Sequence, residues 1–272
     1  MSIEGAAATR SGASAEPSSE VVGRLRAAGC VFAEDEARLL AGEARTPAKL
    51  ERMVAERVAG RPLEQVLGWA EFAGLRVAVE PGVFVPRRRT ELLVRLAGEL
   101  AGSDSVAVEL CCGTGAISMA LAAAVPGLRL SAVDLDPAAV RCARRNLAAT
   151  DAQVLQGDLC QPLPASLRGR IDVLIANAPY VPSEAIALMP PEAREHEPPL
   201  ALDGGPDGLD VQRRIIAEAP EWLRPQGVLL IETGRAQAPL TAAAMVAAGL
   251  TARIETDDDL DATAVLGKRA SG

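Results

Sequence analysis

From residue 106 onward the chain alternates short apolar runs with stretches of helical periodicity, and this alternation constrains the fold more than any other feature. Short apolar runs bounded by turn residues are typical of buried strands, and helical stretches between them are typical of crossover connections. The pattern therefore predicts an α/β fold with a doubly wound parallel sheet. The predicted strands are 106–110, 129–134, 154–156, 171–176 and 228–232, with two more near 252–256 and 263–268. The predicted helices are 116–125, 137–150, 207–219 and 237–248.

The residues before this sheet carry a different pattern. We predict a disordered tail over residues 1–19, a small helical N-terminal domain over 20–60, a linker and β-hairpin over 61–90, and a larger α/β domain over 91–272. The tail is rich in alanine and serine, whereas the helical domain shows capping signals at two helix starts.

Two helix starts in the small domain have recognisable caps. Ser19 can cap a helix that starts at Glu20, and Thr46 can cap a helix with Pro47 at its first position. In that second helix, four-residue spacing predicts one buried apolar stripe. Its members are Leu50, Val54 and Val58, with Met53 beside them.

The charge balance argues against a nucleic-acid partner. Acidic residues outnumber basic ones 36 to 28, and the formal net charge is -8. Affinity for a phosphate backbone comes largely from Lys and Arg. An excess of acidic residues therefore disfavours such binding. No apolar run reaches the roughly 18 residues of a membrane helix, and the N-terminal segment lacks the pattern of a signal peptide. We therefore expect a cytoplasmic protein without a membrane partner.

The chain is poor in metal ligands and in the parts of a nucleophilic relay. It has five cysteines without a CxxC pair, and His196 is its single histidine. An odd number of cysteines suits reduced thiols better than a disulfide framework. The usual zinc sites and a Ser-His-Asp relay depend on histidine, so we expect no metal site and a different chemistry.

Segment 109–115, Glu-Leu-Cys-Cys-Gly-Thr-Gly, lies directly between a predicted strand and a predicted helix. Its glycines allow a tight turn and let a ligand approach main-chain N–H groups. A strand-to-helix turn without a ligand would show the same glycine pair, so the pair alone does not establish a ligand-binding site. The candidate ligand-binding residues of this turn are Glu109, Cys111, Cys112, Gly113, Thr114 and Gly115.

An acidic residue, Asp134, ends the next predicted strand. A carboxylate roughly twenty residues after a glycine turn can accept both hydroxyls of a ribose. Asp136 is better placed to cap the helix that Pro137 starts. This spacing indicates a nucleoside-binding site of the kind that dehydrogenases and methyltransferases share.

The tetrapeptide Asn177-Ala-Pro-Tyr180 follows predicted strand 171–176 and decides between those two classes. It resembles the (D/N)PPY motif of methyltransferases that act on planar nitrogen. Segment 85–94, Val-Pro-Arg-Arg-Arg-Thr-Glu-Leu-Leu-Val, resembles the IPRPxTExLV segment of the protein-glutamine N5-methyltransferases that modify peptide release factors. Residues 61–68 and 197–202 are similar to further stretches of that family, and the resemblance extends to residue 269.

The resemblance implies methyl transfer to the side-chain amide N5 of a glutamine in a protein, with a release-factor-like protein as partner. It implies a class I methyltransferase domain that uses S-adenosylmethionine as cofactor. In this family the cofactor would be held by the glycine turn, Asp134 and Asn177. Asp158 would read the adenine amino group, and Leu159 would flank the ring.

An amide nitrogen is a weak nucleophile because its lone pair is delocalised, so orienting it is the main catalytic task. The resemblance makes Asn177 and Tyr180 the catalytic candidates. The Asn177 side-chain oxygen and the Ala178 carbonyl would each accept one N–H of the substrate amide. Pro179 favours an extended backbone at residue 178, and the Tyr180 ring would pack against the substrate or the positive sulfonium. The predicted substrate-binding residues are therefore Asn177, Ala178, Pro179 and Tyr180.

The chain departs from the family pattern at several places. Ala178 stands where the first proline of NPPY is expected, and Arg88 replaces the second proline of IPRP. Cys111 replaces the usual first glycine of the turn, and Cys112 replaces a small polar residue. Segment 262–265 lacks an arginine that the family often carries before its last strand. These departures predict a divergent branch of the family.

Two alternatives stay open. An N6-adenine methyltransferase would use the same motif on nucleic acid, although the acidic charge balance and the lack of an obvious target-recognition domain argue against it. A cofactor-binding protein that has lost turnover through its altered motifs is the second alternative, and only a turnover measurement separates it from an enzyme.

Overall fold

The computed structural model describes residues 18–271, and this part of the chain divides into two compact units that meet between residues 67 and 68. The tail predicted over residues 1–19 therefore lies outside the described residues except for its last two. The Ser18 hydroxyl accepts the N–H of Val21 at 3.2 Å, so Ser18 and not Ser19 caps the first helix. That helix begins one residue earlier than predicted.

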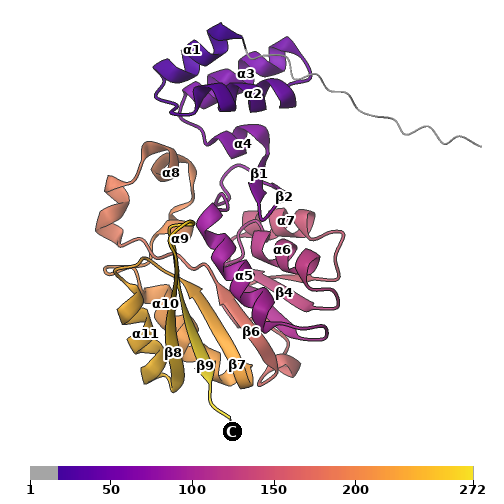
Figure 1. Ribbon diagram of the computed structural model, residues 1–272, viewed down its shortest axis with the longest axis vertical. Coiled ribbons are helices and arrows are strands. Elements are labelled where there is room, and N and C mark those ends of the chain that lie inside the picture. Colours follow the sequence, from indigo (N-terminus) through magenta and orange to yellow (C-terminus); the bar gives the residue numbers. More distant parts are fainter. Residues whose placement is uncertain (1–17, 272) are drawn as a thin grey trace, which may run out of the picture. The chain divides into compact units, whose positions relative to one another are not determined.

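The described part of the first unit is helical (Figure 1). Its helices are α1 (Ser19–Ala27), α2 (Ala33–Glu43), α3 (Pro47–Val58) and α4 (Leu63–Leu67). Met53 and Val54 of α3 are buried together with Leu25 and Leu40, whereas Val58 is 40% exposed. The predicted apolar stripe is wrong at Val58, because the helix ends there and its last turn is exposed.

The second unit contains a seven-stranded sheet with the order β5-β4-β3-β6-β7-β9-β8. Adjacent strands run parallel from β5 to β7, and β9 pairs antiparallel with both β7 and β8. The α/β fold with a doubly wound sheet is thus confirmed. The strands are β3 (Val106–Leu110), β4 (Arg129–Asp134), β5 (Gln153–Gln156), β6 (Ile171–Ala176), β7 (Leu223–Glu232), β8 (Leu250–Asp257) and β9 (Ala262–Arg269).

Helices cover both faces of this sheet (Figure 1). On one face lie α5 (Glu91–Leu100), α6 (Ala116–Ala124) and α7 (Pro137–Asn146), and on the other lie α10 (Asp210–Trp222) and α11 (Ala238–Ala247). Leu93 and Leu121 pack on the first face, while Ile215 and Met245 pack on the second. Alternate strand residues face opposite sides, so each face buries its own apolar set.

Three predicted helix boundaries are wrong by three or more residues. Helix α10 ends at Trp222 and not at residue 219. Helix α7 ends at Asn146 and not at residue 150, because Leu147 leaves the helix as its C-cap. Helix α10 begins at Asp210 and not at residue 207, since the Asp207 side chain accepts the N–H of Leu209 and forms a turn before the helix.

Shorter elements connect the main helices and strands. Before α5 come the antiparallel hairpin of β1 (Trp69–Phe72) and β2 (Leu75–Ala78) and the 3-10 turn η1 (Arg88–Thr90). After β5 comes η2 (Ala165–Leu167). After β6 come η3 (Ser183–Leu188), α8 (Pro191–His196) and α9 (Pro199–Leu202). Within residues 18–271, no helix is both long enough and apolar enough to cross a membrane.

Candidate active site

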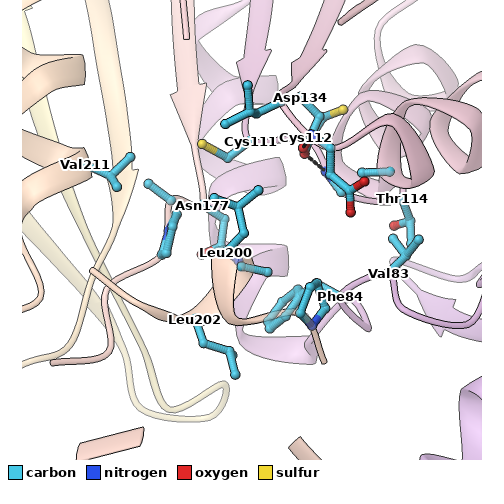
Figure 2. Close-up of a pocket in the computed structure, with 18 of the residues that line it drawn as sticks. Val83, Phe84, Cys111, Cys112, Thr114, Asp134, Asn177, Leu200, Leu202 and Val211 are labelled. Carbon is cyan, nitrogen blue, oxygen red and sulfur yellow. Dashed lines mark hydrogen bonds between the residues drawn. The ribbon is translucent and has the colours of Figure 1, made fainter. Parts of the chain in front are cut away.

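A pocket of about 220 Å³ opens at the carboxyl ends of the strands (Figure 2). The chain first builds β3, β4 and β5 in one direction and then crosses to β6 on the other side of β3. The pocket therefore lies at the point where strand order reverses, which is where open α/β sheets bind their ligands. All of its lining residues belong to the second unit.

The turn after β3 has an unusual backbone. Cys111, Gly113 and Gly115 all have left-handed conformations, with φ values of 54°, 53° and 73°. Glycine adopts this conformation freely, but a cysteine adopts it at a cost of roughly 1 kcal/mol. Cys111 thus keeps the backbone course of a glycine turn while adding a thiol that lines the pocket.

Gly115 is required for packing and does not line the pocket. A Cβ atom at this position would lie 3.1 Å from the Cβ of Ala143 in α7. The glycine therefore lets the start of α6 approach α7 closely. The prediction that Gly115 contacts a ligand has no support from its position, because the residue faces a helix.

Asp134, at the end of β4, is tied to the glycine turn. Its Oδ2 accepts the N–H of Gly113 at 2.8 Å, and its Oδ1 accepts the N–H of Asp136 at 2.9 Å (Figure 2). Asp136 itself caps α7 through the N–H of Ala138, as predicted. Desolvation raises the pKa of Asp134, and no cationic side chain among residues 18–271 pairs with it.

Glu109 lies in β3 just before the same turn, and its side chain faces the start of α6. Its Oε2 accepts the main-chain N–H of Ser118 at 2.8 Å and also the Ser118 hydroxyl. The carboxyl is 2% exposed, and burial raises its pKa to about 7. Glu109 therefore supports the first turn of α6 while also lining the pocket.

Asp158 and Leu159 follow β5. Arg214 of α10 donates Nη2 to Asp158 Oδ2 at 2.6 Å, a pairing that the sequence did not reveal. Gln161 reaches the same oxygen at 3.4 Å, so Oδ1 is the atom that remains for a ligand. Leu159 is 6% exposed and has a left-handed backbone, with φ at 49°.

Asn177 and its neighbours follow β6. Nδ2 of Asn177 donates to Thr90 Oγ1 at 3.1 Å, which leaves the side-chain oxygen for the pocket. Ala178 is 1% exposed, and Pro179 and Tyr180 complete the tetrapeptide in the lining.

Glu232 is the buried carboxylate that sequence reasoning missed. It ends β7, is 2% exposed, and accepts the Tyr180 hydroxyl on Oε1 at 3.1 Å. Arg89 Nε lies 3.4 Å from the same oxygen, whereas Oε2 is buried without a hydrogen-bond partner among the described residues. Burial raises the pKa of Glu232. Burial, together with Glu232, raises the pKa of Tyr180, so the phenol stays protonated. An acidic residue at the end of a predicted strand was the signal for Glu232, as it was for Asp134.

A third buried carboxylate, Glu197, also lines the pocket. Its Oε1 accepts Arg87 Nη2 and the N–H of Val85, whereas Oε2 is buried without a hydrogen-bond partner among the described residues. Burial raises the pKa of Glu197, and Arg87 partly opposes this rise. Phe84, Leu200 and Leu202 add apolar surface nearby (Figure 2).

The structure brings the predicted site residues together around this one pocket, apart from Gly115. The lining includes Glu109, Cys111, Cys112, Gly113, Thr114, Asp134, Asp158, Leu159, Asn177, Ala178, Pro179 and Tyr180. The cysteines carry no sign of nucleophilic activation, because burial raises the pKa of the Cys111 and Cys112 thiols. A nucleophilic role for either thiol therefore has no electrostatic support.

Comparison with known proteins points to methyltransferases. Residues 74–189 match the family model of the methyltransferase small domain. A release factor glutamine methyltransferase of Moorella thermoacetica is 39% identical over 243 residues, which are 80% of this chain and 84% of that relative. The corresponding protein of Mycolicibacterium smegmatis is 43% identical over 187 residues, 68% of this chain and 66% of the relative. For it and several other relatives, the matched region covers slightly less than two thirds of the relative's length.

One relative has a different printed activity. A 4-amino-L-phenylalanine/4-methylamino-L-phenylalanine methyltransferase of Streptomyces pristinaespiralis is 37% identical over 198 residues, 70% of this chain and 67% of that protein.

Solved structures agree in fold. A methyltransferase of Pyrococcus furiosus has a TM-score of 0.55 at 16% identity, over 72% of this chain and 90% of its own. A T. Thermophilus 16S rRNA N2 G1207 methyltransferase, solved with AdoMet and guanosine, has a TM-score of 0.54 at 20% identity, over 74% of this chain and 49% of its own. At these identities the likeness establishes the fold of class I methyltransferases alone.

Proposed function

This chain belongs to the release factor glutamine methyltransferase family, and we propose that it methylates the side-chain amide nitrogen of a glutamine in a release factor. The methyl donor in this proposal is S-adenosylmethionine. The observation that carries the proposal is the Asn177 amide, which is held by Thr90 with its oxygen left for the pocket.

The residues around Asp134 fit the nucleoside of this cofactor. A carboxylate offers about four acceptor positions, and two of those of Asp134 are taken by the N–H groups of Gly113 and Asp136. The remaining two suit a pair of ribose hydroxyls. Desolvation raises the pKa of Asp134 without a cationic partner, so hydroxyl donors would stabilise its ionised form.

The glycine turn fits the same ligand. A Cβ atom at Gly113 would meet no atom within 4 Å, so the turn leaves open space on that side. Asp158 Oδ1 and the Leu159 side chain would hold the adenine end in this proposal. When bound, the cofactor supplies an electrophilic methyl group on a sulfonium.

Positioning is the task of the chain's own residues. The substrate amide carries two N–H donors, and the Asn177 oxygen and the Ala178 carbonyl would accept one each. With the amide plane fixed in this way, its weak nitrogen nucleophile is aligned without a strong base. The Tyr180 ring, anchored by its hydroxyl to Glu232, would form one wall of the acceptor site.

A protein substrate suits the apolar part of the pocket lining. Phe84 and Leu200 give apolar contact to small residues beside the glutamine. A release-factor loop that carries the glutamine would fit this part of the pocket.

The test is methyl transfer from labelled S-adenosylmethionine to an intact release factor, followed by mass spectrometry of the modified residue. We expect one methyl group on the glutamine side chain and a loss of orders of magnitude with Asn177→Ala. Label in adenine of DNA or RNA, with release factors unlabelled, would support the nucleic-acid alternative instead. An absence of turnover on both acceptors would favour a cofactor-binding protein.

A second candidate acceptor is a small aromatic amine. The observations behind it are the arylamine activity in the name of one relative and Arg89, which lies 5.9 Å from the Tyr180 ring in the pocket wall. A guanidinium there would pair with the carboxylate of a free amino acid. Turnover of 4-amino-L-phenylalanine, in competition with a release factor, distinguishes the two acceptors.

A further inference from the structure

The side-chain amide of Gln237 joins three loops of the second unit. Its Nε2 donates to the main-chain carbonyls of Tyr180 and Asp207, each at 2.9 Å. Its Oε1 accepts the N–H of Gly234 at 3.3 Å. A glutamine amide has two N–H donors and one carbonyl oxygen, so every polar group of this side chain is used. Gln237 itself is not among the described residues that line the pocket.

The main chain around Gln237 gives this amide a fixed base. Gln237 is the N-cap of α11, where its N–H donates to the carbonyl of Gly234 at 2.9 Å and its carbonyl accepts the N–H of Thr241 at 3.0 Å. Glu232, at the end of β7, accepts the Tyr180 hydroxyl at 3.1 Å. The connection from β7 to α11 therefore holds Tyr180 at two points, the hydroxyl and the main-chain carbonyl.

Two glycines leave room for the amide. A Cβ atom at Gly208 would overlap both Gln237 Nε2 and the Tyr180 carbonyl oxygen. A Cβ atom at Gly234 would lie 2.7 Å from Gln237 Oε1. The amide thus occupies a closely fitted space, and segment 203–208, Asp-Gly-Gly-Pro-Asp-Gly, forms one side of it.

The carbonyl that Gln237 holds is the last of segment 177–180, which the proposed function assigns to the acceptor. The next residue, Val181, donates its N–H to the Leu202 carbonyl at 3.0 Å. Two residues before the held carbonyl lies Ala178, whose own carbonyl would accept one N–H of the substrate amide. Gln237 therefore restrains the backbone that leads to this acceptor atom.

We propose that Gln237 is a positioning residue for methyl transfer, which holds the Tyr180 carbonyl and so keeps the Ala178 carbonyl in place for the substrate amide. Gln237 touches neither the cofactor nor the reacting nitrogen in this role. The inference rests on the proposed function and adds a residue outside the pocket lining. It predicts a loss of kcat that leaves cofactor binding almost unchanged.

The first test uses the full chain, labelled S-adenosylmethionine and an intact release factor. Gln237→Glu keeps the size of the side chain but replaces its NH2 group by an oxygen, which the two carbonyls would repel. We expect kcat to fall by about tenfold or more, while the cofactor Kd changes by less than about twofold. An unchanged kcat would overturn the proposal, and so would an equal loss in cofactor affinity, which would show that Gln237 only supports the fold.

Gln226→Glu is the matched control for the change of charge. Gln226 is exposed and lies near the start of β7, whereas the pocket lies at the carboxyl ends of the strands. Q226E should keep the parent kcat. If Q237E does not fold, Gln237→Ala takes its place, because it also removes both donors.

The second test displaces the same contact from the opposite side. Gly208→Ala would push the amide away from the Tyr180 carbonyl, and Gly249→Ala is its control. Gly208 and Gly249 have similar φ values of 77° and 83°, but a Cβ atom at Gly249 would meet no atom within 4 Å. G208A should therefore have a kcat about tenfold or more below that of G249A. Equal kcat for the two variants would contradict the proposal.

A double variant separates one shared contact from two independent effects. Because G208A and Q237E break the same hydrogen bond, the double variant should lose less than about threefold beyond the worse single variant. Fully additive losses would mean that the two residues act separately, and the proposal would fail. Failure of the proposed function would look different, because the parent chain itself would then leave release factors unmethylated.

Discussion

Gly113 donates its main-chain N–H to Oδ2 of Asp134 at 2.8 Å, and this bond joins the turn after β3 to the end of β4. The two segments come from neighbouring parallel strands, in which Leu110 pairs with Val133. The carboxylate is thus oriented by the fold and needs no ligand to place it. A preorganised acceptor of this kind reduces the ordering cost of binding.

Asp134→Ala should weaken binding of S-adenosylmethionine by about 1.5 to 3 kcal/mol, the range for a hydrogen bond to a charged group. Isothermal titration calorimetry measures this change. Asp136→Asn is the matched control, because an amide oxygen can still cap α7, and its affinity should remain close to that of the parent chain. Unchanged affinity in folded D134A would contradict the placement of the ribose.

Glu109 should make stability depend on pH. Burial raises its pKa to about 7 in the folded state, while an unfolded glutamate titrates near its ordinary value of about 4.3. Between these values the folded chain holds a proton that the unfolded chain lacks. Stability therefore falls as pH rises from about 4.3 through 7, and it levels off above that range.

Glu109→Gln removes this titration while keeping an oxygen for Ser118. Urea unfolding at pH 5 and pH 8 should show that the variant loses about 1 to 3 kcal/mol less stability than the parent chain across this interval. A pH dependence equal in both proteins would show that Glu109 is ionised throughout, and the protonated state would have to be abandoned.

Cys111 offers a test of backbone strain. Its φ of 54° suits glycine, so Cys111→Gly should be more stable than Cys111→Ala by about 1 kcal/mol. Both variants remove the thiol, and the comparison therefore isolates the backbone. Thermal unfolding of the two proteins measures the difference. Greater stability of C111A would contradict the left-handed conformation at this position.

The predictable parts of this molecule are those that local sequence encodes. Each strand of the sheet was visible as a short apolar run, and the turn at Gly113 was visible because a left-handed residue favours glycine. The end of α7 was not visible in the sequence, because the helical pattern continues past Asn146 without a helix-breaking residue.

Side-chain pairing across the fold was also beyond the sequence. Arg214 reaches Asp158 across 56 positions, and Tyr180 reaches Glu232 across 52. Many other arginines could have paired with Asp158, and many other glutamates with Tyr180. The order of the strands in the sheet determines which residues meet. The hydrogen bond from Asn177 to Thr90 is of the same kind, since it spans 87 positions.

Ala178→Pro should restore the family motif without loss of activity. The main-chain N–H of Ala178 donates to no other main-chain group among the described residues, so a proline there breaks no main-chain hydrogen bond. Restricting the unfolded chain should add about 0.4 to 1 kcal/mol of stability if the backbone accepts the ring. Turnover and thermal unfolding test both expectations. A severe loss of activity would show that the acceptor site depends on alanine at this position.

An intact release factor should be a better acceptor than an isolated peptide with the same glutamine. Two leucines in the pocket wall, Leu135 and Leu200, are 48% and 53% exposed, and they offer apolar contact to a folded partner. A flexible peptide must also be ordered on binding, which costs about 0.5 to 1.5 kcal/mol for each immobilised side chain. We therefore expect kcat/KM for the intact protein to exceed that of the peptide by about a hundredfold or more. Leu200→Ser should reduce this ratio while turnover of the peptide changes little, and equal kcat/KM for the two acceptors would show that the glutamine segment alone is recognised.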